Sequence, residues 1–193
     1  FAKQGAEVHI VELTEESAKD AVTEISAAGG KVFSHACNVA NQQEVLATFE
    51  KIGNINILIN NAGISMRALL KDCDLSVIKQ VMDINFWGTV YCTKFALPYL
   101  LKSKGTVVGV SSIAGIKGLP ARTGYSASKF AMHGFLESLR IENLKTGLKV
   151  LIACPGYTAS NIRNAALNQE GKSQSESPFD ESKLMSAEKV ANE

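Results

Sequence analysis

Short apolar runs alternate with helix-periodic segments along the whole chain, and turn residues separate them. Continuous apolar runs of strand length indicate buried strands, and apolar positions spaced three and four apart indicate amphipathic helices. The predicted strands are Val8–Val11, Lys31–Val39, Ile55–Ile59, Gly105–Ser111 and Leu148–Cys154. The predicted helices are Thr14–Ala28, Asn41–Ile52, Asp74–Leu101 and Tyr125–Leu144. Residues 157–183 are polar and rich in Ser, Asn and Gln, which predicts a mobile loop with helical pieces.

Strand–helix alternation with continuous apolar strands predicts a parallel sheet covered by helices on both faces, which is the α/β doubly wound fold class. The length of 193 residues fits a single domain, and no repeat or linker interrupts the pattern. The sequence opens at Phe1 in what resembles the end of a helix and closes on an opening helix. We therefore expect residues 1–193 to be one Rossmann-like domain truncated at both ends, with the first and last strands of its sheet outside this chain.

Composition and charge exclude several classes of partner. The net charge is +1 without a basic run, so we expect neither a nucleic acid nor a membrane surface as partner. No apolar stretch is long enough to predict a membrane span. The four cysteines show no metal-binding spacing, which predicts free thiols, no metal site and a cytoplasmic location.

Candidate chemistry centres on Tyr125 and Lys129, which lie four residues apart in a predicted helix. Residues at this spacing share a helix face, and a neighbouring ammonium is expected to lower the pKa of the Tyr125 phenol toward neutrality. Such a phenol is a general acid/base for an alcohol/carbonyl pair. Ser112 ends a predicted strand thirteen residues upstream of Tyr125 and is expected to orient the substrate oxygen, in preference to the adjacent Ser111.

Five predicted strands end at, or are followed by, residues suited to ligand binding, as expected for parallel α/β folds. These residues are Glu12, Asn38, Asn61, Ser112 and the Pro155-Gly156 pair. An acid in the position of Glu12 can bond both ribose hydroxyls of a dinucleotide and would repel a 2′-phosphate. The sequence therefore predicts NAD in preference to NADP.

The chain also carries an ordered set of short motifs. They are Asn60-Asn61-Ala62-Gly63 after a strand, Asn85, Ser111-Ser112, Tyr125-x-x-x-Lys129, and Pro155-Gly156 followed by Thr158. In their order and spacing they resemble the short-chain dehydrogenase/reductase family over essentially the whole chain. The segment 125–131 most resembles the branch that acts on hydroxysteroids, retinoids and other lipophilic carbonyls. The family's glycine-rich turn, T-G-x-x-x-G-x-G, is expected before Phe1 together with the first strand, whose absence would split the sheet.

The resemblance implies a role for each motif. Lys129 would also bond the nicotinamide ribose, and Asn85 would anchor a water that relays protons through Lys129, beside a structural role in holding its helix to the sheet. Asn61, Ala62 and Gly63 would contact the adenosine side of the cofactor, and Asn38-Val39 would hold the adenine. Pro155, Gly156 and Thr158 would lie beside the nicotinamide of the cofactor. Arg67 and Tyr157 are further candidates for the substrate mouth.

We therefore expect a nicotinamide-dependent oxidoreductase that interconverts a small-molecule secondary alcohol and ketone. The alternatives are a nucleotide-sugar epimerase or dehydratase that retains NAD, and a dinucleotide-binding protein without catalysis. The resemblance also implies a homodimer or homotetramer that pairs through the helices carrying Asn85 and Tyr125. The substrate itself stays open at this stage.

Overall fold

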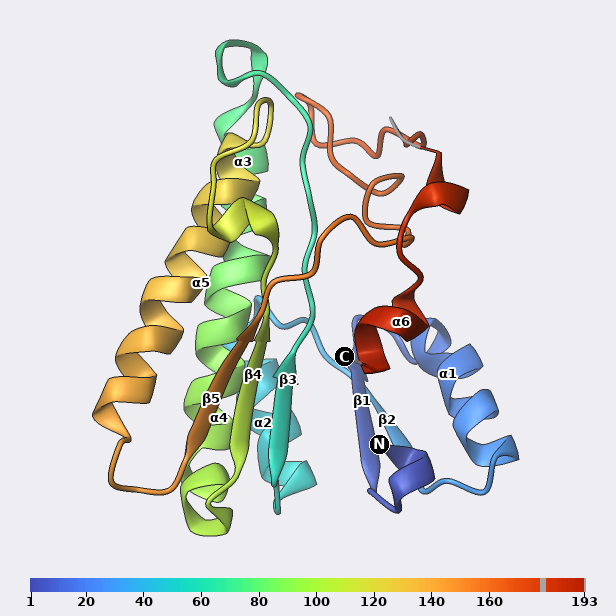
Figure 1. The fold of residues 1–193 in the computed structure, drawn as a ribbon, viewed down its shortest axis with the longest axis vertical. Helices are drawn as coiled ribbons and strands as arrows, with labels where there is room; N and C mark the ends of the chain where they lie inside the picture. The colour runs from blue at the N-terminus through green and yellow to red at the C-terminus, as the bar shows by residue number, and fades with distance from the viewer. Residues whose placement is uncertain (178–179, 193) are drawn as a thin grey trace.

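The computed structural model describes residues 1–177 and 180–192. Its strands are β1 (Val8–Glu12), β2 (Val32–Ala36), β3 (Ile57–Asn60), β4 (Thr106–Val110) and β5 (Lys149–Ala153). Its α-helices are α1 (Glu15–Ala27), α2 (Gln42–Ile52), α3 (Leu75–Met82), α4 (Gly88–Ser103), α5 (Thr123–Glu142) and α6 (Ala187–Asn192). Short helical turns lie at Ala2–Gln4, Leu70–Asp72, Ile113–Gly115 and Glu181–Lys183. The predicted alternation of strands and helices is confirmed (Figure 1).

All pairings between the described strands are parallel, as predicted. β1 pairs with β2, and β4 lies between β3 and β5 with Leu58, Val107 and Val150 in register. The sheet is in two parts, because no described strand pairs with β1 on the side that faces β3. Parallel strands bring their carboxyl ends to one edge, so the predicted ligand-binding residues share that edge.

Helices cover the two parts of the sheet differently. α1 packs on β1 and β2, whereas α4 and α5 lie together along one face of β3–β5 (Figure 1). Leu58, Val107 and Val150 point to that face and are buried in the main apolar core. On the opposite face Ile59 and Leu151 are 41% and 55% exposed. Helices were expected on both faces of the sheet, but in the β3–β5 part the described helices cover one face.

Helix ends follow from local chemistry. Thr14 caps α1 by accepting a hydrogen bond from the backbone N–H of Ser17, and Gly29 after the helix adopts φ of 77°. The predicted helix over residues 74–101 is present as one continuous helical stretch. A π-helical turn at Asp83–Trp87 joins α3 to α4 within it. Turns of this kind are rare and frequently mark functional sites, and this one carries Asn85.

The polar segment after β5 folds back over the segment that follows β3. Leu167 forms an isolated parallel bridge with Met66, and the backbone N–H of Asp74 donates to the carbonyl of Gln169 at 3.0 Å. These contacts bring residues about a hundred positions apart in the chain to one end of the molecule. The predicted loop over 157–183 is thus a packed strap in its described part, and residues 178–179 lie outside the described residues.

Candidate active site

Ser112 and Tyr125 meet beyond the carboxyl end of β4. Ser112 follows the strand in an extended conformation, and its Oγ accepts a hydrogen bond from the N–H of Ala114 at 3.2 Å. The Tyr125 side chain, in the first turn of α5, lies close enough to the side chain of Ser112 for that hydroxyl to act on the pKa of the phenol. Tyr125 is buried in a second apolar cluster, where Met66 and Val81 are its neighbours. The two hydroxyls that the sequence predicted to act together are therefore adjacent.

Lys129 lies one helical turn beyond Tyr125 and is 3% exposed. Its Nζ donates to the backbone carbonyl of Val110 at 2.9 Å and lies 5.8 Å from the centroid of the Tyr125 ring. Burial disfavours the charged form and lowers the pKa of Lys129 to about 8. The ammonium is thus tied to the end of β4, beside the phenol, as the shared helix face predicted.

The pKa of Tyr125 departs from the sequence-based expectation. Burial of the phenol raises its pKa, which opposes the predicted shift toward neutrality. The Ser112 hydroxyl and the charges of Arg122 and Arg163 act in the lowering direction. The expectation that Lys129 sets this pKa is therefore corrected: desolvation dominates, and the charges that lower the pKa of the phenol are those of Arg122 and Arg163.

Asn85 clamps the loop after β3 to α5. Its Oδ1 accepts from the N–H of Ile64 at 2.8 Å, and its Nδ2 donates to the Ile64 carbonyl and to Ser128 Oγ, each at 2.9 Å. The side chain is fully buried, so these bonds satisfy a group that would otherwise be costly to bury. The geometry agrees with the structural role, and the proton-relay role stays a prediction.

Gly63 lies beside the side chains of both Asn85 and Lys129. A Cβ at this position would come within 3.2 Å of Asn85 Oδ1 and 3.5 Å of Lys129 Nζ. The absence of a side chain lets the loop backbone approach both groups. Asn60, at the end of β3, donates to Thr93 Oγ1 at 3.0 Å and is structural, as predicted.

A hollow lies between β1 and β3, where the sheet is interrupted, and residues along the whole of both strands line it. Near the carboxyl ends of the strands its lining includes the residues predicted to hold the adenosine side of a dinucleotide, namely Glu12, Asn38, Val39, Asn61, Ala62 and Gly63. Glu12 is exposed there, and its carboxylate can accept hydrogen bonds from both hydroxyls of a ribose. The described residues therefore fit the adenosine portion of such a cofactor.

Two details refine these cofactor candidates. Asn38 Oδ1 accepts from the N–H of Ala40 at 3.0 Å, so part of this side chain shapes its own turn. Val39 packs against Gly88, where a Cβ would come within 2.9 Å of a Val39 methyl group. Val39 thus fixes the position of the turn on α4 in addition to facing the hollow.

Pro155, Gly156 and Thr158 follow β5 at the same edge of the sheet as Ser112. Thr158 Oγ1 donates to the Gly156 carbonyl at 3.3 Å, and a Cβ at Gly156 would meet nothing within 4 Å. These three residues do not line the hollow that contains Glu12. They follow β5, which pairs with β4, the strand that leads into Ser112, and their contact with a nicotinamide stays a prediction.

Sequence reasoning missed three contributors. The charges of Arg122, before Tyr125 in the sequence, and of Arg163, after it, both lower the pKa of the phenol. Only Arg122 could have been found from the sequence, because it lies three residues from Tyr125. His133, one turn beyond Lys129, has Nε2 2.7 Å from Ser111 Oγ. This contact links α5 to the residue before Ser112.

Other site classes find no support in the part of the chain that the structure describes. No group of three or more His, Cys, Asp or Glu side chains is placed to hold a metal ion there. No described helix is long and apolar enough to cross a membrane. All four cysteines are free thiols, and burial raises the pKa of Cys92 to about 12, which makes that thiol unreactive.

Comparison with known proteins bears on this geometry. A family model described as short chain dehydrogenase matches residues 1–171. The chain is 35% identical to 11-beta-hydroxysteroid dehydrogenase-like 2 of Arabidopsis thaliana, over 84% of this chain and 54% of that protein. It is also 35% identical to the 3-oxoacyl-[acyl-carrier-protein] reductase of a Synechocystis strain, over 84% of this chain and 68% of that protein.

A crystal structure of NAD+-bound xylitol dehydrogenase superposes with a TM-score of 0.79 and 25% identity, over 82% of this chain and 64% of that one. The likeness confirms the Rossmann-like fold class. The chain spans about half the length of the plant hydroxysteroid dehydrogenase-like relatives that it matches.

Proposed function

The chain belongs to the short-chain dehydrogenase family, and on this premise we propose that it is an oxidoreductase that interconverts a secondary alcohol and a ketone with NAD or NADP. The observation that carries the proposal is the contact between Ser112 and Tyr125, with Lys129 on the next turn of α5. This set lies at the sheet edge where α/β folds bind ligands, and Glu12, Asn61, Ala62 and Gly63 lie at the carboxyl ends of strands on the same edge.

In this proposal Tyr125 is the general acid of reduction and the general base of oxidation. Its hydroxyl gives a proton to the forming alkoxide oxygen, or takes one from the alcohol, while Ser112 bonds the same oxygen and orients it. Lys129, held by the Val110 carbonyl, keeps a positive charge beside the phenol. Asn85 keeps the loop after β3 against α5, so that these groups stay in register.

A nicotinamide held at the Pro155–Thr158 side would supply or accept the hydride. We assign Glu12 to the adenosine ribose and Asn61, Ala62 and Gly63 to the backbone contacts beside it, because all four line the hollow. Glu12 is exposed at the end of β1, where a carboxylate would repel a 2′-phosphate. The proposal therefore favours NAD over NADP.

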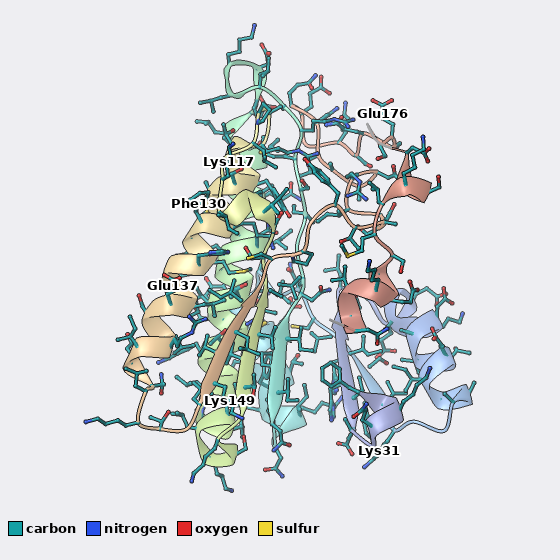
Figure 2. The ribbon with its side chains drawn as sticks, in the orientation of Figure 1. Lys31, Lys117, Phe130, Glu137, Lys149 and Glu176 are labelled. Carbon is teal, nitrogen blue, oxygen red and sulfur yellow. The ribbon has the colours of Figure 1, made fainter. Side chains whose placement is uncertain are left out.

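We also propose that the protein assembles as a homodimer or homotetramer through α4 and α5. Trp87 and Phe130 are 43% and 47% exposed, and Phe86 makes edge contacts with Trp87 and with Phe135. Figure 2 labels Phe130 on α5, where it adds to this aromatic surface.

Free thiols at the four cysteines favour a reducing compartment such as the cytoplasm.

The experiment that tests the proposed function is a titration of the full-length protein with NADH and NADPH, followed by the fluorescence of the reduced nicotinamide. Saturable binding of NADH, and turnover of at least one secondary alcohol or ketone in a substrate screen, are the expected results. Binding of neither cofactor would contradict the proposal and would leave the fold without this activity.

A further inference from the structure

Three arginines from three separate segments of the chain act on one another at Arg122, and two of them, Arg122 and Arg163, also act on Tyr125. Arg67 follows β3, Arg122 is the residue before α5, and Arg163 follows β5. Two backbone hydrogen bonds hold the segments together: Ala68 N–H donates to the Ala121 carbonyl at 3.0 Å, and Arg67 N–H donates to the Leu167 carbonyl at 2.8 Å. Burial lowers the pKa of Arg122, and the positive charges of Arg67 and Arg163 lower it further. The fold therefore holds like charges close enough to repel one another.

The described carboxylates offset little of the charge of Arg67 and Arg122. Arg67 Nε donates to Gln174 Oε1 at 2.7 Å, and its Nη2 lies 3.3 Å from Glu176 Oε1. The Glu176 side chain is 76% exposed, and Figure 2 labels it in the segment after β5. Water screens an ion pair of that kind, so its contribution is small.

Arg122 is the cation with the least compensation. Its Nη1 donates to Ser65 Oγ, a neutral acceptor, and no carboxylate among residues 1–177 and 180–192 pairs with it. The described residues contain no buried side-chain nitrogen without a hydrogen-bond partner. Arg122 is partly exposed, so its Nε and Nη2 donors are not sealed inside the protein.

Backbone strain adjoins the residues that carry this arrangement. Ala121, directly before Arg122, has φ of 56°, and Ser175, between the two residues that bond Arg67, has φ of 58°. Apart from glycines, Lys104 at the end of α4 is the other described residue with positive φ. A left-handed conformation is unfavourable for Ala and Ser, and strain of this kind clusters at ligand-binding sites.

The charges also act at the atom where chemistry takes place. Arg122 and Arg163 both lower the pKa of the Tyr125 phenol, and the charge of Arg122 also reaches Tyr157. Tyr157, predicted to line the substrate mouth, is 48% exposed. A ligand whose reacting oxygen touches Tyr125 would thus bring its other end within reach of Arg122.

We propose that Arg122, with Arg67 beside it, binds the anionic end of the substrate, a carboxylate or phosphate carried on the same molecule as the reacting alcohol or ketone. This inference rests on the proposed function, because it places the anion beside the oxygen that Tyr125 protonates. A guanidinium presents paired donors that match the oxygens of either group, and the bound anion offsets the repulsion between the arginines. The substrate is then a hydroxy or oxo acid or a phosphate ester, and a neutral lipophilic ketone is a poorer substrate.

Matched substrate pairs test the proposal with the full-length protein and its cofactor. One pair is a short-chain hydroxy acid and its methyl ester, and the other is a hydroxyalkyl phosphate and its parent diol. The ratio of kcat/KM between the charged and the neutral member is measured for wild type, Arg122→Gln and Arg140→Gln. Arg140 is the matched control, because it bonds the Val150 carbonyl near the opposite end of α5.

We expect wild type to prefer the charged member of at least one pair by about tenfold or more, as for hydrogen bonds to charged groups. Arg122→Gln should reduce this ratio by about tenfold, and Arg140→Gln should leave it unchanged. The pair that shows the preference identifies carboxylate or phosphate. Turnover with no preference, or a preference for the neutral members, would overturn the proposal and leave the proposed function intact. The wild-type comparison decides this point even when a variant fails to fold.

Absence of turnover with every compound would contradict the proposed function, and binding then decides the anion site alone. Calorimetric titration with a short-chain oxo acid, its amide and inorganic phosphate provides the readout. Saturable binding of an anion that Arg122→Gln weakens about tenfold, without binding of the amide, would support the site. No saturable anion binding by the wild-type protein would overturn it.

Discussion

Lys129 is held by Val110: its Nζ donates to the Val110 carbonyl at 2.9 Å, at the end of the strand that leads into Ser112. The ammonium therefore links the helix that carries Tyr125 to the strand that carries Ser112. Because it is buried, and no carboxylate among the described residues pairs with it, its pKa falls to about 8, below the usual value of a lysine. The buried positive charge of Lys129, which the proposed chemistry uses, therefore destabilises the folded state.

Replacement of Lys129 by Met removes the buried charge and should therefore stabilise the fold. Below the folded pKa of about 8 both states of the wild type are charged, and burial of the charge destabilises the fold. Between about 8 and about 10.4 the unfolded chain binds more protons, so the stability of the wild type rises with pH. We expect Lys129→Met to be more stable than wild type by about 1–2 kcal/mol near pH 7, with a gap that shrinks above about pH 8.

Urea unfolding at about pH 7 and about pH 9.5 measures this difference, and turnover should fall in the same variant. The account is contradicted if wild type is the more stable protein near neutrality, or if the gap does not change with pH.

Gly63 provides a test of the packing between Asn85 and Lys129. An alanine methyl group would come within 3.2 Å of Asn85 Oδ1 and 3.5 Å of Lys129 Nζ, so one of the two must move. We expect Gly63→Ala to lower kcat about tenfold, because small displacements in a preorganised site are costly. Gly118→Ala is the control, since a Cβ there meets nothing within 4 Å. Steady-state kinetics gives the comparison, and equal kcat for the two variants would count against the proposed arrangement.

Glu12 should set the cofactor preference. Replacement by Gln removes the negative charge at the end of β1 that would repel a 2′-phosphate. We predict that Glu12→Gln improves the affinity for NADPH relative to NADH by about tenfold. Fluorescence titration of both cofactors measures the ratio, with Glu16→Gln on the exposed face of α1 as control. An unchanged ratio would mean that Glu12 does not face the ribose.

The aromatic surface on α4 and α5 should mediate self-association. Trp87 stacks on Tyr91, with ring centroids 5.7 Å apart, and remains exposed together with Phe130. We expect wild type to sediment as a dimer or tetramer at micromolar concentration, and the double change Trp87→Ser, Phe130→Ser to shift it to monomer. A change of Phe33→Ser, an exposed aromatic on β2, serves as control. A monomeric wild type would contradict this part of the account.

Much of the fold was predictable because its signals are local. Each strand and helix has its own apolar period, and the i,i+4 spacing of Tyr125 and Lys129 is enough to place both side chains on one helix face. The π-turn at Asn85 was not predictable, since one additional residue in a turn barely alters the apolar pattern of a long helix. The arginines beside Tyr125 were not predictable either. Arg67 and Arg163 both act on Arg122 because the segment after β5 folds back over the segment after β3.

The direction of the Tyr125 shift depends on the tertiary fold. Sequence spacing showed which cation is near the phenol along the helix, and it carried no information on how much water surrounds that phenol. In the folded chain Tyr125 is 8% exposed, and this burial raises its pKa against the effect of every neighbouring charge. Desolvation depends on residues from distant segments, so it is the effect that a sequence shows least.

The central claim is that the Tyr125 hydroxyl transfers the proton, and Tyr125→Phe tests it most directly. Turnover and NADH affinity are measured for wild type, for this variant, and for Tyr99→Phe as a control that packs against the main core on α4. Because only the hydroxyl is lost, the account predicts that kcat falls about a hundredfold or more while the NADH affinity changes little. A Tyr125→Phe enzyme that retains the turnover of wild type would contradict the account.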